Sequence, residues 1–166
     1  VTKNATTGAF TTNHLNVKFD FVGMTHAAVS AGSGVALPAD QVSTVNFTGA
    51  AACSMNLPAA TVGTRVAYVQ RVDTTGGTNT LTINADGTDA WVTGSLIETR
   101  AADAVSYDTS TAGEGQLVFT AANATTNFFT IGSILYFSCT TKGLWHVGLD
   151  SAKDPLAVKG AFAWAA

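Results

Sequence analysis

Charged residues are scarce in this chain of 166 residues. Lys, Arg, Asp and Glu together make up 11% of it, whereas ordinary soluble domains contain about 25%. Lys and Glu form the solvated faces of helices, so their scarcity argues against a helical bundle. The formal net charge is −3, and no stretch gathers Lys or Arg. We therefore expect no partner that is recognised by phosphate neutralisation, and no nucleic-acid binding.

Long apolar runs and cysteines are also few. No run of 18 apolar residues occurs, so we expect no membrane-spanning helix and no membrane partner. The two cysteines, Cys53 and Cys139, lie far apart and match no metal-binding spacing. Both stand in apolar, strand-like runs, which predicts buried free thiols, with a bridge between them as the alternative. A chain of this size can bury a core without a disulfide or a metal.

Thr, Ala and Gly fill the place of the missing charges. Thr and Val favour a pleated, half-buried surface, and Gly supplies turns. Residues 15–21 (LNVKFDF) and 80–84 (TLTIN) alternate apolar and polar residues with period two, which is typical of half-buried strands. Helical periodicity persists nowhere. The sequence predicts an all-β fold, a single β-sandwich or barrel, jelly-roll-like, with extended terminal arms.

Turn signals divide the chain into shorter units. Leu-Pro-Ala occurs at 37–39 and again at 57–59, and a strand follows each copy, at 42–47 and 64–69. We interpret these copies as two consecutive turn-and-strand units. The Gly-rich segment at 73–77 predicts a hairpin that joins the strands at 64–69 and 80–84.

The second half of the chain contains one clear hairpin and one irregular stretch. Residues 134–137 and 144–148 are predicted to pair around a tight turn at 141–143. Short strands are expected at 90–92, 95–97 and 116–121. Residues 99–115 show no period and are predicted to form a long exposed loop.

The two ends of the chain are expected to lie outside the sandwich. We assign residues 1–13 to an N-terminal arm, 14–150 to the β-sandwich and 151–166 to a C-terminal tail. The aromatic residues of the tail must dock either on their own domain or on a neighbour, because exposed aromatics are a liability. The candidate protein-interface residues are Val1, Thr2, Lys3, Asn4, Phe10, Phe162 and Trp164.

No motif in the sequence predicts catalysis. The three histidines, His14, His26 and His146, have no zinc-type spacing and no neighbouring Cys or Glu. Turn chemistry explains Asp86 and Asp89, for which weak calcium binding is the alternative. We expect no enzyme, no catalytic residue, no cofactor and no metal.

The aromatic residues leave one alternative open. Trp91, Trp145 and Trp164 are expected to pack in the core or at an interface, although they could also stack on sugar rings.

Four segments together resemble β-rich structural proteins of tailed bacteriophages, especially capsid decoration (cement) proteins and modules of tail spikes and fibres. The segments are LPAATVGT at 57–64, LTINADG at 81–87, ILYF at 134–137 and KGLWHVG at 142–148. They cover turns and strands and bring no functional residues with them. Residues 99–127 depart from the pattern, which leaves open which of the two phage roles applies.

The resemblance implies a function in the virion, on the outer capsid surface. A decoration protein bridges neighbouring subunits of the major capsid protein and stabilises the shell, often as a homotrimer. The alternatives are a receptor-binding module of a tail fibre or spike and a secreted carbohydrate-binding domain. A low charge fits a molecule whose flanks are occupied by other proteins.

Overall fold

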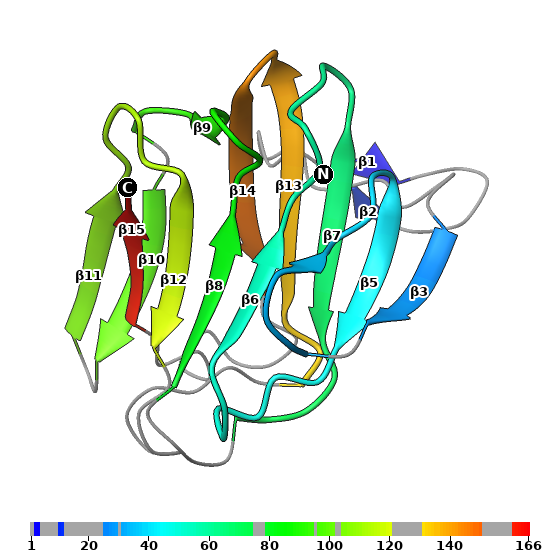
Figure 1. Cartoon of the computed structure of the whole chain (residues 1–166), viewed down its shortest axis with the longest axis vertical. Helices are drawn as coiled ribbons and strands as arrows, with labels where there is room; N and C mark the ends of the chain where they lie inside the picture. The colour runs from blue at the N-terminus through cyan, green and yellow to red at the C-terminus, as the bar shows by residue number, and fades with distance from the viewer. Residues whose placement is uncertain are drawn as a thin grey trace.

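The computed structural model describes residues 2–3, 10–11, 25–29, 31–74, 79–94, 96–101, 104–120, 131–150 and 161–166. All regular structure in these ranges is β-strand (Figure 1). The described part accordingly contains no helix of the length and apolar character that crossing a membrane requires. The strand predicted at 15–21 lies outside the described residues.

Two sheets form the body of the molecule. The six-stranded sheet has the order β3-β5-β7-β13-β14-β9, and the five-stranded sheet has the order β15-β12-β8-β6-β4. The first contains β3 (Thr25–Val29), β5 (Gln41–Val45), β7 (Arg65–Gln70), β13 (Ile134–Thr141), β14 (Leu144–Asp150) and β9 (Ala90–Trp91). The second contains β15 (Ala161–Ala165), β12 (Gln116–Thr120), β8 (Thr80–Asn84), β6 (Cys53–Asn56) and β4 (Val35–Ala36). Figure 1 shows the five-stranded sheet in front of the six-stranded one.

This arrangement confirms the predicted all-β sandwich. The sheets do not close on each other, so the barrel alternative is wrong. Several neighbouring strands are parallel, among them β3–β5, β5–β7, β4–β6 and β6–β8. These parallel pairs distinguish the fold from a jelly roll, whose sheets are antiparallel.

From β3 to β8 the chain winds as a coil, which we call the parallel coil. Each strand lies in the sheet opposite to the one before it, so that like strands stack in parallel. Val35 is the register partner of Met55, and Met55 is the partner of Ile83. Directly after these strands, the N–H of Leu37 donates to Asn56 O at 2.8 Å and that of Leu57 donates to Asn84 O at 2.8 Å. The two Leu-Pro-Ala copies therefore occupy the same step of two successive turns of the coil.

The hairpin predicted between 64–69 and 80–84 is wrong because of this winding. β7 and β8 both exist, but β7 belongs to the six-stranded sheet and β8 to the five-stranded one. The Gly-rich segment between them therefore joins two sheets. Gly permits a sharp change of direction in either case, so it does not distinguish a hairpin from a crossover.

The strands from β12 to β15, which we call the antiparallel half, pair in the opposite sense. β13 and β14 form the predicted hairpin, with Cys139 opposite Trp145 and a register shift between Cys139 and Thr141. The loop between them contains Gly143 at a φ of 80°, a conformation that favours glycine. β12 pairs antiparallel with both β8 and β15, and so connects this half to the coil.

Two sequence predictions are corrected after β9. The long loop predicted over residues 99–115 is wrong for most of this range. β10 (Leu96–Ala101) and β11 (Ala104–Thr109) occupy it and pair antiparallel with each other. Residues 161–165 form β15 and complete the five-stranded sheet, so this part of the expected tail belongs to the sandwich. At the other end of the chain, β1 (Thr2–Lys3) and β2 (Phe10–Thr11) pair with each other.

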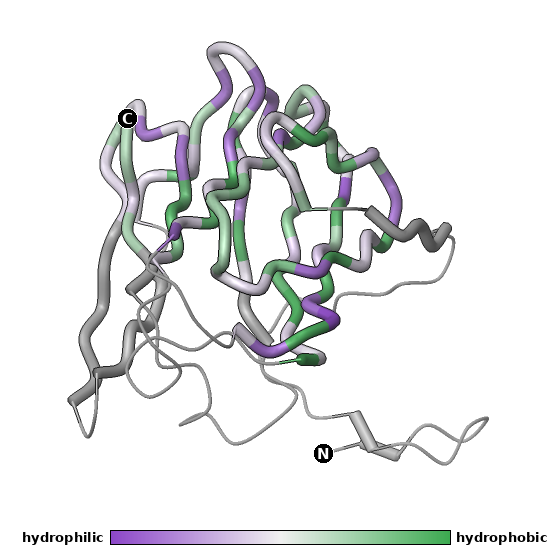
Figure 2. Tube along the Cα trace, turned by 60° about the horizontal axis from the view of Figure 1, so that its bottom comes forward, coloured by the Kyte–Doolittle hydropathy of each residue, from purple (hydrophilic) through white to green (hydrophobic). Residues whose placement is uncertain are grey.

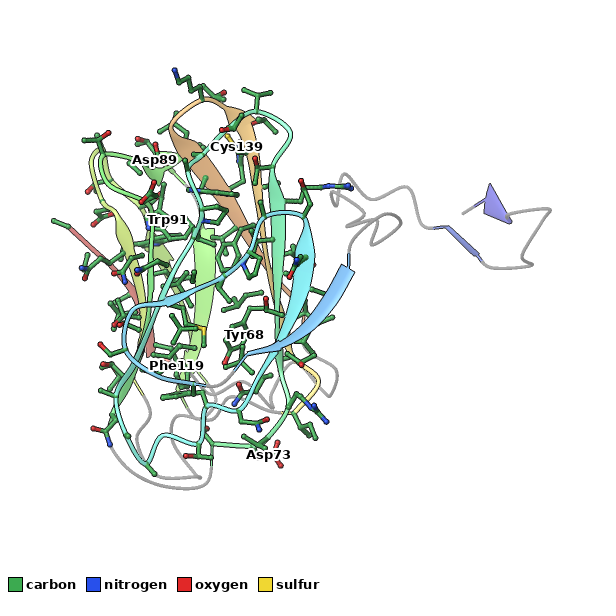
Figure 3. All side chains as sticks on the ribbon, turned by 45° about the vertical axis from the view of Figure 1, so that its right-hand side comes forward. Tyr68, Asp73, Asp89, Trp91, Phe119 and Cys139 are labelled. Atoms are coloured by element: carbon green, nitrogen blue, oxygen red, sulfur yellow. The ribbon has the colours of Figure 1, made fainter. Side chains whose placement is uncertain are left out.

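Large apolar side chains fill the space between the two sheets. Hydrophobic and hydrophilic residues alternate along the strands in Figure 2, and Figure 3 shows Tyr68 and Phe119 between the sheets. The rings of Phe47 and Phe119 meet edge to face, with centroids 6.4 Å apart. Residues of the parallel coil and of the antiparallel half belong to one hydrophobic cluster, which makes the sandwich one core.

One polar chain is built into this core. The Tyr68 hydroxyl donates to Gln70 Oε1 at 2.5 Å, and Gln70 Nε2 donates to the Phe47 carbonyl at 2.6 Å. Gln70 is fully buried, and its backbone N–H donates to Ser133 O at 2.9 Å. Because buried polar groups are costly when unpaired, this set of bonds fixes how β7 meets the 46–49 loop and the start of β13.

Candidate protein-interaction surfaces

The outer face of the five-stranded sheet consists of uncharged side chains in register. Asn56, Asn84 and Gln116 form one row across three strands, with Ala36 and Ala165 at its ends. Asn84 Nδ2 donates to Asn56 Oδ1 at 2.8 Å, which ties two members of the row. These residues point outward because their neighbours along the strands, such as Met55 and Ile83, are buried.

The next rows of this face have the same character. Ser54, Thr82, Val118 and Ala163 are register partners, and Thr80 lies opposite Thr120. The outward side chains that the structure describes on this sheet are therefore amides, hydroxyls and small apolar groups. They form a surface that we call the uncharged face.

Within the two sheets of the sandwich, charged residues lie at the ends of the strands. Among the side chains that the structure describes, each Lys, Arg, Asp and Glu is in a loop or at the first position of a strand. These residues are Asp40, Arg65, Arg71, Asp73, Asp86, Asp89, Glu114 and Lys142. Figure 3 shows Asp89 towards one end of the sandwich and Asp73 at the other. The described side chains in the middle of the strands of these two sheets thus include no Lys, Arg, Asp or Glu.

The outer face of the six-stranded sheet differs in shape and polarity. Val42, Ala67, Tyr136 and Gly148 form one row of register partners across it. The Tyr136 ring lies against Gly148, where an added Cβ would overlap the ring. Another row of register partners lies where β7 begins. There the positively charged Arg65 is opposite Ser138, and Ser138 is opposite His146 on its other side. This face is therefore more uneven than the uncharged face and is charged at its margin.

Asp89 joins three loops at one end of the sandwich. Its Oδ2 accepts a hydrogen bond of 2.6 Å from the Ala60 N–H. The neighbouring Ala90 N–H donates to Gly143 O at 2.9 Å, and the Gly143 N–H donates to Ala60 O at 3.0 Å. In the Asp86–Asp89 segment, which was considered for calcium binding, the Asp89 carboxylate therefore accepts a hydrogen bond from the backbone of Ala60. Across the described ranges, no group of three His, Cys, Asp or Glu residues is placed to hold a metal ion.

The three tryptophans are buried. Trp91 is 1% exposed, Trp145 0% and Trp164 8%, and the rings of Trp91 and Trp164 have centroids 5.3 Å apart. None of them offers a ring face on which a sugar could stack. Trp164, expected among the interface residues, moves to the core, because β15 docks on its own sheet.

The other candidate interface residues are placed only in part. Thr2, Lys3 and Phe10 lie in the β1–β2 pair, and Phe162 lies in β15 opposite Phe119. The side chains of these four residues are not among those described, and Val1 and Asn4 lie outside the described residues. The sequence missed the uncharged face itself. The signal for it was present in the outward positions of 80–84 and 116–120, which lack any charge.

The core contains two thiols and one phenol that can titrate, Cys53, Cys139 and Tyr68. Cys53 and Cys139 are free thiols in the core, as expected. Burial raises the pKa of the Cys53 thiol, against the smaller effect of a hydrogen bond with the Gly32 backbone. Burial, and then the nearby Cys53, raise the pKa of Tyr68 well above its ordinary value. Both groups stay neutral at physiological pH, which makes Cys53 a poor nucleophile.

His146 lies on the outer side of β14. Its Nε2 is 2.7 Å from Thr140 Oγ1. His26 lies in β3, its side chain not among those described, and His14 lies outside the described residues.

Comparison with known proteins found no matching family model, no matching curated sequence and no matching solved structure. No relative therefore bears on the function of this chain. The resemblance to phage structural proteins stays a prediction, and a functional argument must start from the surfaces described above.

Proposed function

We propose that this chain is a viral structural protein that decorates the outside of a tailed-phage capsid and stabilises it by bridging neighbouring capsid subunits. The observation that carries the proposal is the uncharged face, a sheet surface whose described outward side chains carry no charge. The centres of protein interfaces are depleted in charged residues. A surface of this kind suits a molecule held against other proteins.

The proposed partner is the major capsid protein, and the proposed assembly is a homotrimer. Bridging requires each copy to contact more than one subunit, and symmetric repetition links weak contacts into firm attachment. Residues 1–13 would add a second contact and more buried area by extending onto a neighbour. The alternative of a carbohydrate-binding module loses support, because the three tryptophans that would stack on sugars are buried.

Purified virions test this proposal directly. We expect the protein in hundreds of copies per particle, measured by quantitative gel densitometry against the major capsid protein. A tail-fibre module would be present in few copies, and a secreted protein would be absent from washed particles. Mild heating that releases the protein should leave shells that break at a lower temperature than decorated shells. Equal stability of stripped and decorated shells would contradict the stabilising role.

A further inference from the structure

We infer that the uncharged face is the surface that docks on the capsid, and that its partner there is a flat, uncharged protein surface. This inference rests on the proposed function and adds to it which side of the sandwich makes the contact. The rows of Asn56, Asn84 and Gln116 and of Ser54, Thr82 and Val118 define the surface.

The chemistry of these rows selects the partner. Amide side chains carry both donors and acceptors, and hydroxyls do the same, so they can pair with amide, hydroxyl or backbone groups opposite. The described side chains of this face include no counter-charge. A charged group of the partner would lose its water without gaining an ion pair, which costs several kcal/mol. The complementary surface is therefore uncharged.

The shape of the face leads to the same partner. Its outward side chains are short, from Ala and Ser to Gln, so that another sheet or flat surface can approach closely, at about the 10 Å spacing of packed sheets. On the opposite side, Tyr136 lies across Gly148 and Arg65 stands at the margin. That side would meet a flat partner with fewer contacts.

The area of the face shows that one contact alone is weak. The five strands have two, four, five, five and five residues. At about 4.8 Å by about 3.3 Å per residue they cover roughly 330 Å² per partner. The total of roughly 700 Å² is below the roughly 1,200 Å² of stable pairs. A second copy in solution is therefore not the stable occupant. A shell that presents many copies of the partner surface compensates through linked contacts.

A matched pair of substitutions tests the inference. Thr82 lies in the middle of β8 on the uncharged face, and Thr44 is at a comparable half-buried position on the outer side of β5 in the other sheet. The experiment measures co-sedimentation of the wild type, Thr82→Lys and Thr44→Lys with capsids from which the native protein has been stripped. Melting temperatures identify any variant that is unfolded. Val118→Glu, the register neighbour of Thr82, places the opposite charge on the same face and serves as a second probe.

We expect Thr82→Lys and Val118→Glu each to weaken capsid binding at least about tenfold, and Thr44→Lys to bind like the wild type. Raising the salt concentration from 50 to 500 mM should change wild-type binding by less than about twofold. If the wild type binds and both Thr82→Lys and Val118→Glu bind equally well, the inference is overturned and the proposed function still stands. Stronger binding by one of the two charge variants, or a large salt effect, would contradict an uncharged partner. Failure of the wild type to bind at all would overturn both proposals.

Discussion

The parallel coil and the antiparallel half of this sandwich form their sheets by different routes. In the antiparallel half, the two-residue loop of Lys142 and Gly143 joins β13 directly to its partner β14. In the coil, β5 and β7 pair only after the chain has crossed to the other sheet and returned. The first pairing is set by a local turn, and the second depends on contacts between sheets. A turn signal thus shows where the chain changes direction but not which sheet it enters.

The two halves nevertheless share one core, and they are linked by hydrogen bonds to Ala60 that we call the joint. The hydrophobic cluster includes Met55 and Tyr68 of the coil together with Phe119 and Trp145 of the antiparallel half. Asp89 and Gly143 both bond to Ala60, which lies between β6 and β7. We therefore expect the halves to unfold together in spite of their different topologies.

The largest expected effect is the protection of the two cysteines, one in each half. Cys53 lies in β6 of the coil and Cys139 in β13, and both are buried. If the halves open together, a thiol reagent should modify both at the same rate. That rate should be at least about 10³-fold slower than in the unfolded chain, as follows from a stability of 5 kcal/mol or more. Mass spectrometry of partly labelled protein measures both sites, and earlier labelling of one cysteine would show that the halves open separately.

Removal of a large core side chain should destabilise the whole sandwich from either half. We expect Trp145→Ala to lower the free energy of unfolding by about 3–5 kcal/mol, and Met55→Ala by about 2–5 kcal/mol, in urea titrations. Trp145 Nε1 has no hydrogen-bond partner among the described residues, so Trp145→Phe should cost less. Two separate transitions in Met55→Ala would be evidence against a shared core.

Loss of the buried amide should cost somewhat less. In Gln70→Leu, the hydrogen bonds to the Tyr68 hydroxyl and the Phe47 carbonyl are lost while the size of the side chain is nearly kept. We expect a loss of about 2–4 kcal/mol, because each lost partner of a buried group costs about 1–3 kcal/mol. Tyr68→Phe removes one of these bonds and should cost less than Gln70→Leu. A neutral Gln70→Leu would mean that the polar chain contributes no stability.

The joint between the halves should have a smaller effect. Asp89→Ala removes the acceptor for the Ala60 N–H and should lower stability by about 1–2 kcal/mol. Asp89→Asn keeps an acceptor oxygen at this place and should retain most of the stability. If the two substitutions are equally destabilising in thermal melts, the hydrogen bond is not the cause.

Deletion of residues 1–13 should have almost no effect on stability. β1 and β2 pair with each other, and no described pairing joins them to either half of the sandwich. We expect an unchanged melting temperature and weaker attachment to capsids. A truncated chain that fails to fold would show that this segment belongs to the sandwich.

The sequence was informative wherever a local signal determines structure. The alternation at 80–84 marked β8, and the turn at 141–143 marked the β13–β14 hairpin. It was not informative about partners that lie far away in the chain. The offset between the two Leu-Pro-Ala copies was visible, but only the pairing of Val35 with Met55 shows that it is the pitch of a coil.

Two errors and one omission have physical causes of the same kind. β10 places Leu96 next to Ile97 before a polar run, and β11 alternates only from Val105 to Asp108, so their mutual pairing left too short a period to detect. Trp164 was among the candidate interface residues because the sequence did not show whether the tail docks on its own domain or on a neighbour. The pairing of β15 with β12 places it against Trp91. The uncharged face unites residues from five strands, β4, β6, β8, β12 and β15, which only the sheet order brings side by side.

The position of β15 has a consequence for how the chain matures. It follows every other described strand in the sequence, yet it borders the five-stranded sheet and brings Trp164 onto Trp91. During translation, β12 waits without its outer neighbour until residues 161–165 have left the ribosome. Without residues 161–165, the outer edge of β12 would be unpaired and the ring of Trp91 would lose its contact with Trp164.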